Sequence, residues 1–155
     1  MSMWIYLQAL EPSRLPENTA GFEYLFDVDF DELRRRVGAG EAAWLEYGFF
    51  QLNELYCPRS EPGGDRELPV FGGRHTPDPG GGPGHVALDP PDVARTATYL
   101  HGVSFTDLWQ AWAQLPSSEP DEELLERLAQ DHADLRAFYG RSAERGWAVA
   151  KHFSF

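Results

Sequence analysis

The segment 147-WAVAKHFSF-155 decides the fold, because its side chains alternate between two faces as they do in a β-strand. Every second residue from Trp147 to Phe153 falls on one face, and the residues between them fall on the other. A second strand is predicted over residues 3–10, a bulky, apolar run that stops before Pro12. Strands near both termini, with helices between them, predict a single α+β domain in which one sheet joins the two ends of the chain and several helices cover it.

Helical patterns fill much of the sequence between these two strands. We expect a short strand over residues 85–88 and helices over residues 29–37, 41–56, 90–100, 105–112 and 118–145. The last helix has acidic residues at its start and arginines at its end, as the helix dipole prefers. The helix predicted over 41–56 is apolar almost all round, so we expect it to be central or covered by a partner.

Residues 57–84 differ from the rest in composition, since glycine and proline make up half of them. Only Glu67–Phe71 has a strand-like pattern there, and Pro69 would make it an edge or irregular strand. We interpret 57–84 as a flexible insertion within one domain that spans residues 1–155.

Composition and charge exclude several classes of partner. A chain of 155 residues fits one domain, because two domains of half that length would each be near the lower limit for a self-sufficient core. The formal charge of −12 repels phosphate groups and anionic lipid, so we expect neither nucleic acid nor a membrane as a partner. The basic run Arg34–Arg36 follows acidic residues that largely cancel its charge.

The cysteine content and the apolar runs indicate the compartment. The single cysteine, Cys57, cannot form an internal disulfide and fits a reducing environment. No secretory leader pattern precedes Glu11, and no apolar run has the length of a membrane span. A cytoplasmic location is therefore expected.

Three segments resemble a known protein family. Residues 84–93 (GHVALDPPDV) are similar to a family segment in which a strand enters a Pro-Glu-Glu-Val helix, and residues 135–149 (LRAFYGRSAERGWAV) resemble its C-terminal signature. The opening Met1–Tyr6 is similar to its first strand. Together they resemble the YfbM-like family of bacterial domains of unknown function, most strongly over 84–155.

The resemblance implies a soluble bacterial α+β domain but supplies no established catalytic residues, so none are carried over. This chain departs from the family pattern in its 57–84 segment. It also lacks the family's Tyr-Pro…Trp segment before the last long helix and has only Leu115–Ser118 there. The resemblance therefore implies no ligand contact through that segment here.

We assign no catalytic residue, metal or cofactor from the sequence. His75, Asp78 and His85 could supply three zinc ligands, but no helical pair fixes their geometry. Cys57 follows a predicted helix C-terminus, whose partial negative charge opposes thiolate formation. The sequence contains no nucleophile elbow around Ser104 and no phosphate-binding loop.

Five residues are candidates for ligand binding: His132, Tyr139, Tyr6, Trp109 and Trp112. His132 lies on the apolar stripe of the last helix and could act as a general base if a carboxylate oriented it. A partly buried histidine with one backbone or tyrosine partner is the more common arrangement. Tryptophans at helical spacing, such as Trp109 and Trp112, are likewise more often core residues than part of a ligand site.

Two functional hypotheses follow. The first, which we favour, is an acidic protein-interaction module that binds a basic protein partner, based on the charge of −12, an aromatic content of 14% and the lack of a nucleophile or metal constellation. The second is a small-molecule-binding or hydrolytic enzyme, with a cleft under the 57–84 loop that contains His132 plus Tyr139 or Tyr6. A homodimer formed through the 41–56 helix is compatible with either.

Overall fold

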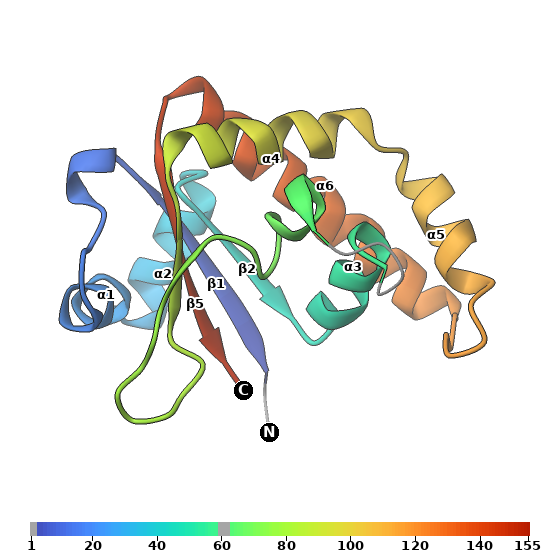
Figure 1. The fold of residues 1–155 in the computed structure, drawn as a ribbon, viewed down its shortest axis with the longest axis horizontal. Coiled ribbons are helices and arrows are strands. Elements are labelled where there is room, and N and C mark those ends of the chain that lie inside the picture. The colour runs from blue at the N-terminus through green and yellow to red at the C-terminus, as the bar shows by residue number, and fades with distance from the viewer. Residues whose placement is uncertain (1–2, 59–62) are drawn as a thin grey trace.

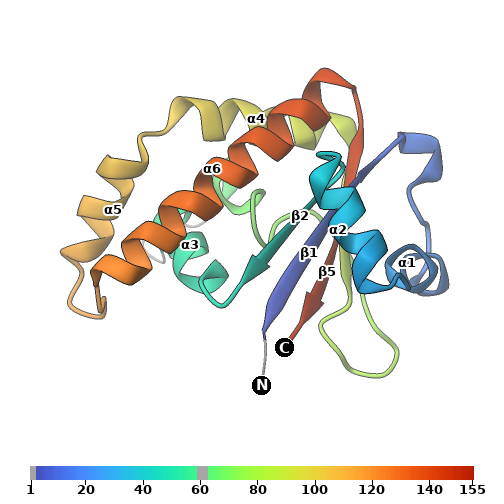
Figure 2. The same cartoon turned by 180° about the vertical axis from the view of Figure 1, so that it is seen from behind.

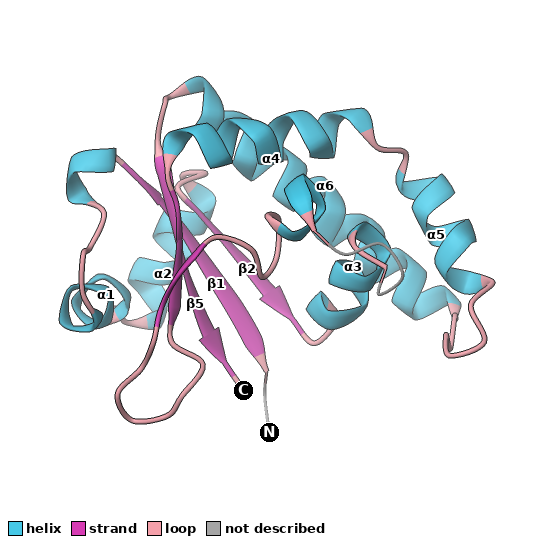
Figure 3. Cartoon of the chain, viewed as in Figure 1, coloured by secondary structure: helices cyan, strands magenta, loops and turns pink. Residues whose placement is uncertain are grey.

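The computed structural model describes residues 3–58 and 63–155, and its centre is one antiparallel sheet (Figures 1 and 3). The strand order is β2 (Ala42–Glu46), β1 (Trp4–Leu10), β5 (Ala148–Ser154), β4 (His85–Leu88) and β3 (Arg74–Thr76). Strands β1 and β5 pair from Trp4↔Ser154 to Leu10↔Ala148 at the middle of the sheet. The prediction of a sheet that joins the two ends of the chain is therefore confirmed, as is the α+β class.

Helices cover both faces of the sheet. Four of them lie on one side of the strands in Figures 1 and 2, namely α3 (Phe49–Tyr56), α4 (Pro90–Gly102), α5 (Phe105–Ala113) and α6 (Glu122–Glu144). The other side is covered by α1 (Thr19–Phe26) and α2 (Phe30–Gly38). Two short 3₁₀ turns, Pro12–Arg14 and Gly64–Glu67, complete the described elements. The chain folds as one compact domain with three layers.

Strand alternation sends side chains into two separate apolar regions. Ile5 and Leu7 of β1 join Val149 and Phe153 of β5 in the large core beneath α3–α6. Tyr6, the residue between the two on β1, packs in a smaller cluster toward α2. Because both faces are buried, β1 appears in the sequence as a nearly continuous apolar run rather than as an alternating one.

Side-chain caps begin three of the helices: α2 and α5 start where the sequence predicts them, whereas α6 starts at Glu122 rather than at the predicted residue 118. Asp29 Oδ1 accepts from Glu32 N at 2.8 Å at the start of α2, and Asp121 Oδ1 accepts from Leu124 N at 2.7 Å at the start of α6. Ser104 Oγ accepts from Asp107 N at 3.3 Å at the start of α5. Each such cap contributes about 1 kcal/mol to stability.

Residues 41–56 do not form the single helix predicted from the sequence, so that prediction is wrong. Strand β2 ends at Glu46 and α3 begins at Phe49. Between them Tyr47 adopts φ 56°, and a Cβ on Gly48 would lie 2.9 Å from Leu128 Cδ2. The run is apolar all round because β2 is buried on both faces, a pattern that a buried strand shares with a buried helix. The homodimer hypothesis loses the single 41–56 helix on which it rested, and homodimerisation itself stays a prediction.

The Gly/Pro-rich segment contains the edge strand, but not where the sequence placed it. Glu67–Phe71 forms no strand, and β3 at Arg74–Thr76 pairs with β4 instead. Residues 59–62 of the predicted insertion, and Met1 and Ser2 of the first-strand resemblance, lie outside the described residues. Helix α1 is not predicted by the sequence patterns, although Asn18 caps its first turn.

No helix in the described part of the chain combines the length and apolar character needed to cross a bilayer.

Candidate functional site

Three of the predicted binding residues lie in separate environments. His132 is 8% exposed, and its Nδ1 lies 2.8 Å from Tyr56 Oη beneath α3. Tyr139 is fully buried and donates to Pro69 O at 3.0 Å. Tyr6 faces α2 on the opposite side of the sheet and donates to Gln8 Oε1 at 2.8 Å. These three side chains therefore have separate hydrogen-bond partners, and Tyr6 lies on the other face of the sheet from His132.

His132 has the tyrosine partner that the sequence considerations favoured. Phe105 lies beside it with ring centroids 5.4 Å apart, and desolvation lowers the pKa of the imidazole. Desolvation also raises the pKa of Tyr56 well above its usual value. Both groups are thus neutral near pH 7, and one neutral hydrogen bond joins α3 to α6.

Trp112 is the predicted residue that lies at a surface hollow. It is 5% exposed, its ring is 5.2 Å from that of Trp109, and its Nε1 donates to Glu54 Oε2 at 3.2 Å. This bond joins α5 to α3, and Trp109 packs beside it against the core.

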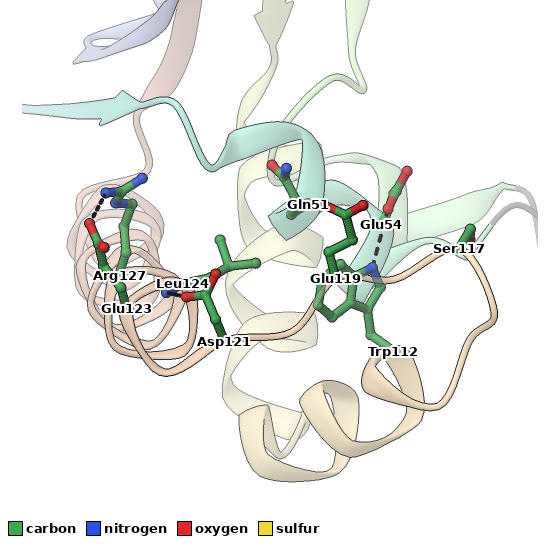
Figure 4. Close-up of a pocket in the computed structure, with 9 residues that line it drawn as sticks. All are labelled: Gln51, Glu54, Trp112, Ser117, Glu119, Asp121, Glu123, Leu124 and Arg127. Carbon is green, nitrogen blue, oxygen red and sulfur yellow. Dashed lines mark hydrogen bonds and ion pairs between the residues drawn. The ribbon is translucent and has the colours of Figure 1, made fainter.

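The hollow at Trp112 is an acidic cleft of about 490 Å³ (Figure 4). Three elements line it: α3, the segment from α5 to α6, and the first turns of α6. The lining residues are Gln51, Glu54, Trp112, Ser117, Glu119, Asp121, Glu123, Leu124 and Arg127. Four carboxylates and one guanidinium thus belong to its lining, and we call this hollow the acidic cleft.

The one cation in the acidic cleft is already paired. Arg127 Nη2 lies 3.2 Å from Glu123 Oε1, one helical turn earlier on α6. Asp121 caps α6, so its negative charge is partly offset by the positive end of the helix dipole. Glu54 accepts only the neutral indole N–H among the contacts described, and Glu119 has no described ion pair. A cation entering the cleft would therefore meet uncompensated negative charge at Glu54 and Glu119.

Gln51 adds an unused acceptor to this site. Its Oε1 is buried and has no hydrogen-bond partner within the described residues. Because a buried acceptor without a donor costs about 1–3 kcal/mol, a donor supplied by a ligand or by water would be favourable there.

A second polar site lies on the α1 side of the sheet. His85 and His152 are directly opposite each other on β4 and β5, with His85 Nε2 2.9 Å from His152 Nδ1. The His85 ring stacks on Phe22 and Phe26 at centroid distances of 5.0 and 5.7 Å. Desolvation lowers the pKa of both imidazoles, that of His152 to about 4. The pair is thus neutral and shares one proton along its hydrogen bond.

The predicted zinc-type residues are not gathered into a site. His75 Nε2 lies 2.9 Å from Pro83 O, Asp78 Oδ1 accepts from Gly80 N at 2.8 Å, and His85 pairs with His152. Within residues 3–58 and 63–155, no three histidine, cysteine or carboxylate side chains are placed to hold a metal ion.

Sequence reasoning missed the acidic residues of the cleft. Glu54 was hidden in the run assigned to one long helix, and Glu119 lies in the connection before α6. The acid-rich segment 119–123 could have indicated a cation-binding site, but acidic residues are also what the start of a helix favours, so the segment did not stand out. Only the tertiary contact between α3 and α5 brings Glu54 beside it.

Comparisons with known proteins support the fold and leave the activity open. No protein-family profile and no curated protein matches this sequence. Among solved structures, the chain is similar to YfbM from Escherichia coli, described as a protein of unknown function. The similarity covers 98% of this chain and 100% of that one, with a TM-score of 0.63 and 13% sequence identity. The chain therefore has a YfbM-like fold.

Proposed function

We propose that this chain is a protein-interaction module that binds a basic protein partner through the acidic cleft. The observation that carries the proposal is the lining of the cleft, whose described residues include four carboxylates and a single arginine that is already paired with one of them. Arginine and lysine side chains are the protein groups that such a lining attracts.

The charge of the whole chain supports the same partner. At −12, the chain attracts a basic protein over a distance and speeds their encounter. Large side chains also reach the surface, with Tyr24 86% exposed and Tyr47 49% exposed. The lone Cys57 fits the reducing cytoplasm of a bacterium, where we place the module.

The test uses a minimal cationic probe. N-acetyl-L-argininamide is titrated into the ¹⁵N-labelled chain, and the indole N–H signal of Trp112 is followed by NMR. We expect a saturable shift with a dissociation constant in the millimolar range, about 4 kcal/mol of binding. N-acetyl-L-citrullinamide, which has nearly the same shape but no charge, is the matched control and is expected to leave the signal unmoved.

Two substitutions locate the binding in the cleft. Glu54→Gln removes a charge but keeps an acceptor for Trp112, and Glu119→Gln removes the other uncompensated charge. Each is expected to weaken arginine binding by up to about fivefold, because an exposed charge pair contributes ~1 kcal/mol or less. Glu144→Gln, at the far end of α6, is the matched control. The proposal would be wrong if all three variants bound the arginine amide with equal affinity. It would also be wrong if the citrulline amide shifted the Trp112 signal as much as the arginine amide does.

The alternative function, a small-molecule-binding or hydrolytic enzyme near the 57–84 segment, has one supporting observation. A second hollow of about 370 Å³ is lined by Pro58 and Arg66 of that segment and by Tyr56 and Tyr99. Among the described residues that line it there is no histidine, and Glu54 is the one carboxylate. It therefore favours binding of an apolar group over hydrolysis.

A further inference from the structure

The acidic cleft and the second hollow share a wall. Glu54 and Trp112 line both, and their hydrogen bond of 3.2 Å lies within that wall. We call the second hollow the apolar hollow, because most of its remaining described lining is apolar or aromatic. These residues are Leu55, Tyr56, Pro58, Tyr99, Val103, Leu108, Ala111 and Leu115, and Arg66 is the one cation among the described residues that line it. The two hollows thus differ in chemistry but meet at one tryptophan.

The wall of the apolar hollow is held rigid from beneath. Tyr56 Oη is hydrogen-bonded to His132 of α6, and Tyr99 Oη of α4 donates to Tyr56 O at 3.2 Å. The rings of Tyr56 and Tyr99 meet edge to face at 5.9 Å. Two of its aromatic side chains are therefore fixed before any ligand arrives, which lowers the entropy lost on binding.

We infer that the two hollows form one site, and that its occupant is a segment of a basic protein carrying a leucine- or phenylalanine-sized side chain beside an arginine or lysine. The apolar side chain enters the apolar hollow, and the cation enters the acidic cleft across the Glu54–Trp112 wall. This inference rests on the proposed function and specifies the chemistry of the partner.

Charge complementarity selects this occupant over a purely apolar one. An apolar segment would leave the carboxylates of the adjoining cleft without a partner, whereas a segment with a neighbouring cation satisfies both hollows at once. Binding sites in proteins commonly combine a buried apolar anchor with a nearby charged contact. A volume of about 370 Å³ is in the range of pockets that enclose such groups.

Short capped peptides test the inference. N-acetyl-L-argininamide is compared with Ac-Arg-Leu-NH₂, Ac-Arg-Gly-Leu-NH₂ and Ac-Arg-Gly-Gly-Leu-NH₂ by the same NMR titration. At least one of the leucine peptides is expected to bind roughly tenfold more tightly than the arginine amide, because burial of a leucine side chain adds that much. Peptides with serine in place of leucine are expected to show no gain.

A pair of substitutions on α5 places the gain in the apolar hollow. Ala111 is exposed and lines the hollow, so Ala111→Phe fills it, while the neighbouring Gln110→Phe adds the same side chain outside it. We expect Ala111→Phe to abolish the tenfold gain while arginine binding persists, and Gln110→Phe to preserve both. Melting curves confirm that both variants are folded.

The outcomes separate the two proposals. Arginine binding without any gain from leucine, or a gain that survives Ala111→Phe, overturns the two-hollow site and leaves the proposed function intact. Failure of the arginine amide itself to bind overturns both.

Discussion

Lys151 and His152 are neighbours on β5, but their side chains lie on opposite faces of the sheet and differ in how many of their polar atoms are hydrogen-bonded. Lys151 is 0% exposed, and its Nζ donates to the carbonyl oxygens of Leu68, Val70 and Gly72. Burial lowers the pKa of this amine well below its usual value, yet three acceptors match the three N–H groups of its charged form. Every donor of the ammonium group is used.

The histidine pair on the other face is only partly satisfied. His85 is 5% exposed, and its Nδ1 has no hydrogen-bond partner in the described part of the chain. Its Nε2 shares a single hydrogen bond with His152. Lys151 therefore fixes the Leu68–Gly72 segment against the sheet, whereas the histidine pair fills space between strands and α1 with little polar stabilisation.

The largest effect on stability is expected from the loss of the Lys151 ammonium group. Lys151→Met keeps the length of the side chain but leaves three carbonyl groups without their donor. We expect a loss of roughly 3–5 kcal/mol in the free energy of unfolding, because each buried acceptor left unpaired costs about 1–3 kcal/mol. Urea unfolding at pH 7 measures it, with His152→Gln as the matched control on the same strand. A loss below about 1 kcal/mol would show that other donors replace the lysine.

The next largest effect is expected in the pH dependence of the free energy of unfolding. The folded pKa of His152, about 4, lies below its unfolded value, so the unfolded chain binds more protons between about pH 4 and 6.5. Stability from this group is present above pH 6.5 and is lost as the pH falls. Between pH 7 and pH 5 we expect His152→Gln to lose about 1–2 kcal/mol less than the parent chain, measured by urea unfolding at both pH values.

Asp131 acts in the opposite direction over the same pH range and serves as the control. Desolvation raises its pKa to about 6, so the folded chain binds more protons and stability falls as the pH rises from about 4 to 6. Asp131→Asn should therefore make the loss of stability on acidification larger than in the parent. If neither substitution changed how the free energy of unfolding depends on pH, the protonation states assigned to His152 and Asp131 would be contradicted.

The smallest effect is expected from His85→Leu. Leucine removes the unpartnered Nδ1 and packs on Phe22 and Phe26, while His152 is partly exposed and can bond to water. These terms oppose the loss of one hydrogen bond, so the free energy of unfolding at pH 7 should change by less than about 1 kcal/mol. A loss of free energy of unfolding as large as that from Lys151→Met would mean that polar groups on both faces of β5 contribute equally to stability.

Much of the fold could be predicted because its signals are local. The strand at β5 follows from alternation, and the starts of α2 and α5 follow from the capping residues Asp29 and Ser104, whereas α6 starts at Glu122 rather than at the predicted residue 118. The division of residues 41–56 into β2 and α3 could not be predicted, because a buried strand and a buried helix are both apolar on every side. The two elements separate at Tyr47, whose φ of 56° lies outside both strand and helix geometry.

The candidate site was less predictable, since it depends on contacts between distant segments. Trp112 was a candidate from its spacing, but Glu54 is 58 residues away and reaches it only through the packing of α3 on α5. The sequence holds 25 carboxylates, so no particular pair could be chosen from spacing alone. The pairing of His85 with His152 depends on strand register, which no local pattern specifies.

Lys151 is the only lysine in the sequence, and it is enclosed. No lysine side chain is thus available to amine-reactive cross-linkers or acylating reagents while the chain is folded, so lysine chemistry would map contacts on the partner's side alone. The rate at which this amine is acylated can also be measured. It reports how often the Leu68–Gly72 segment detaches from the sheet and exposes the amine.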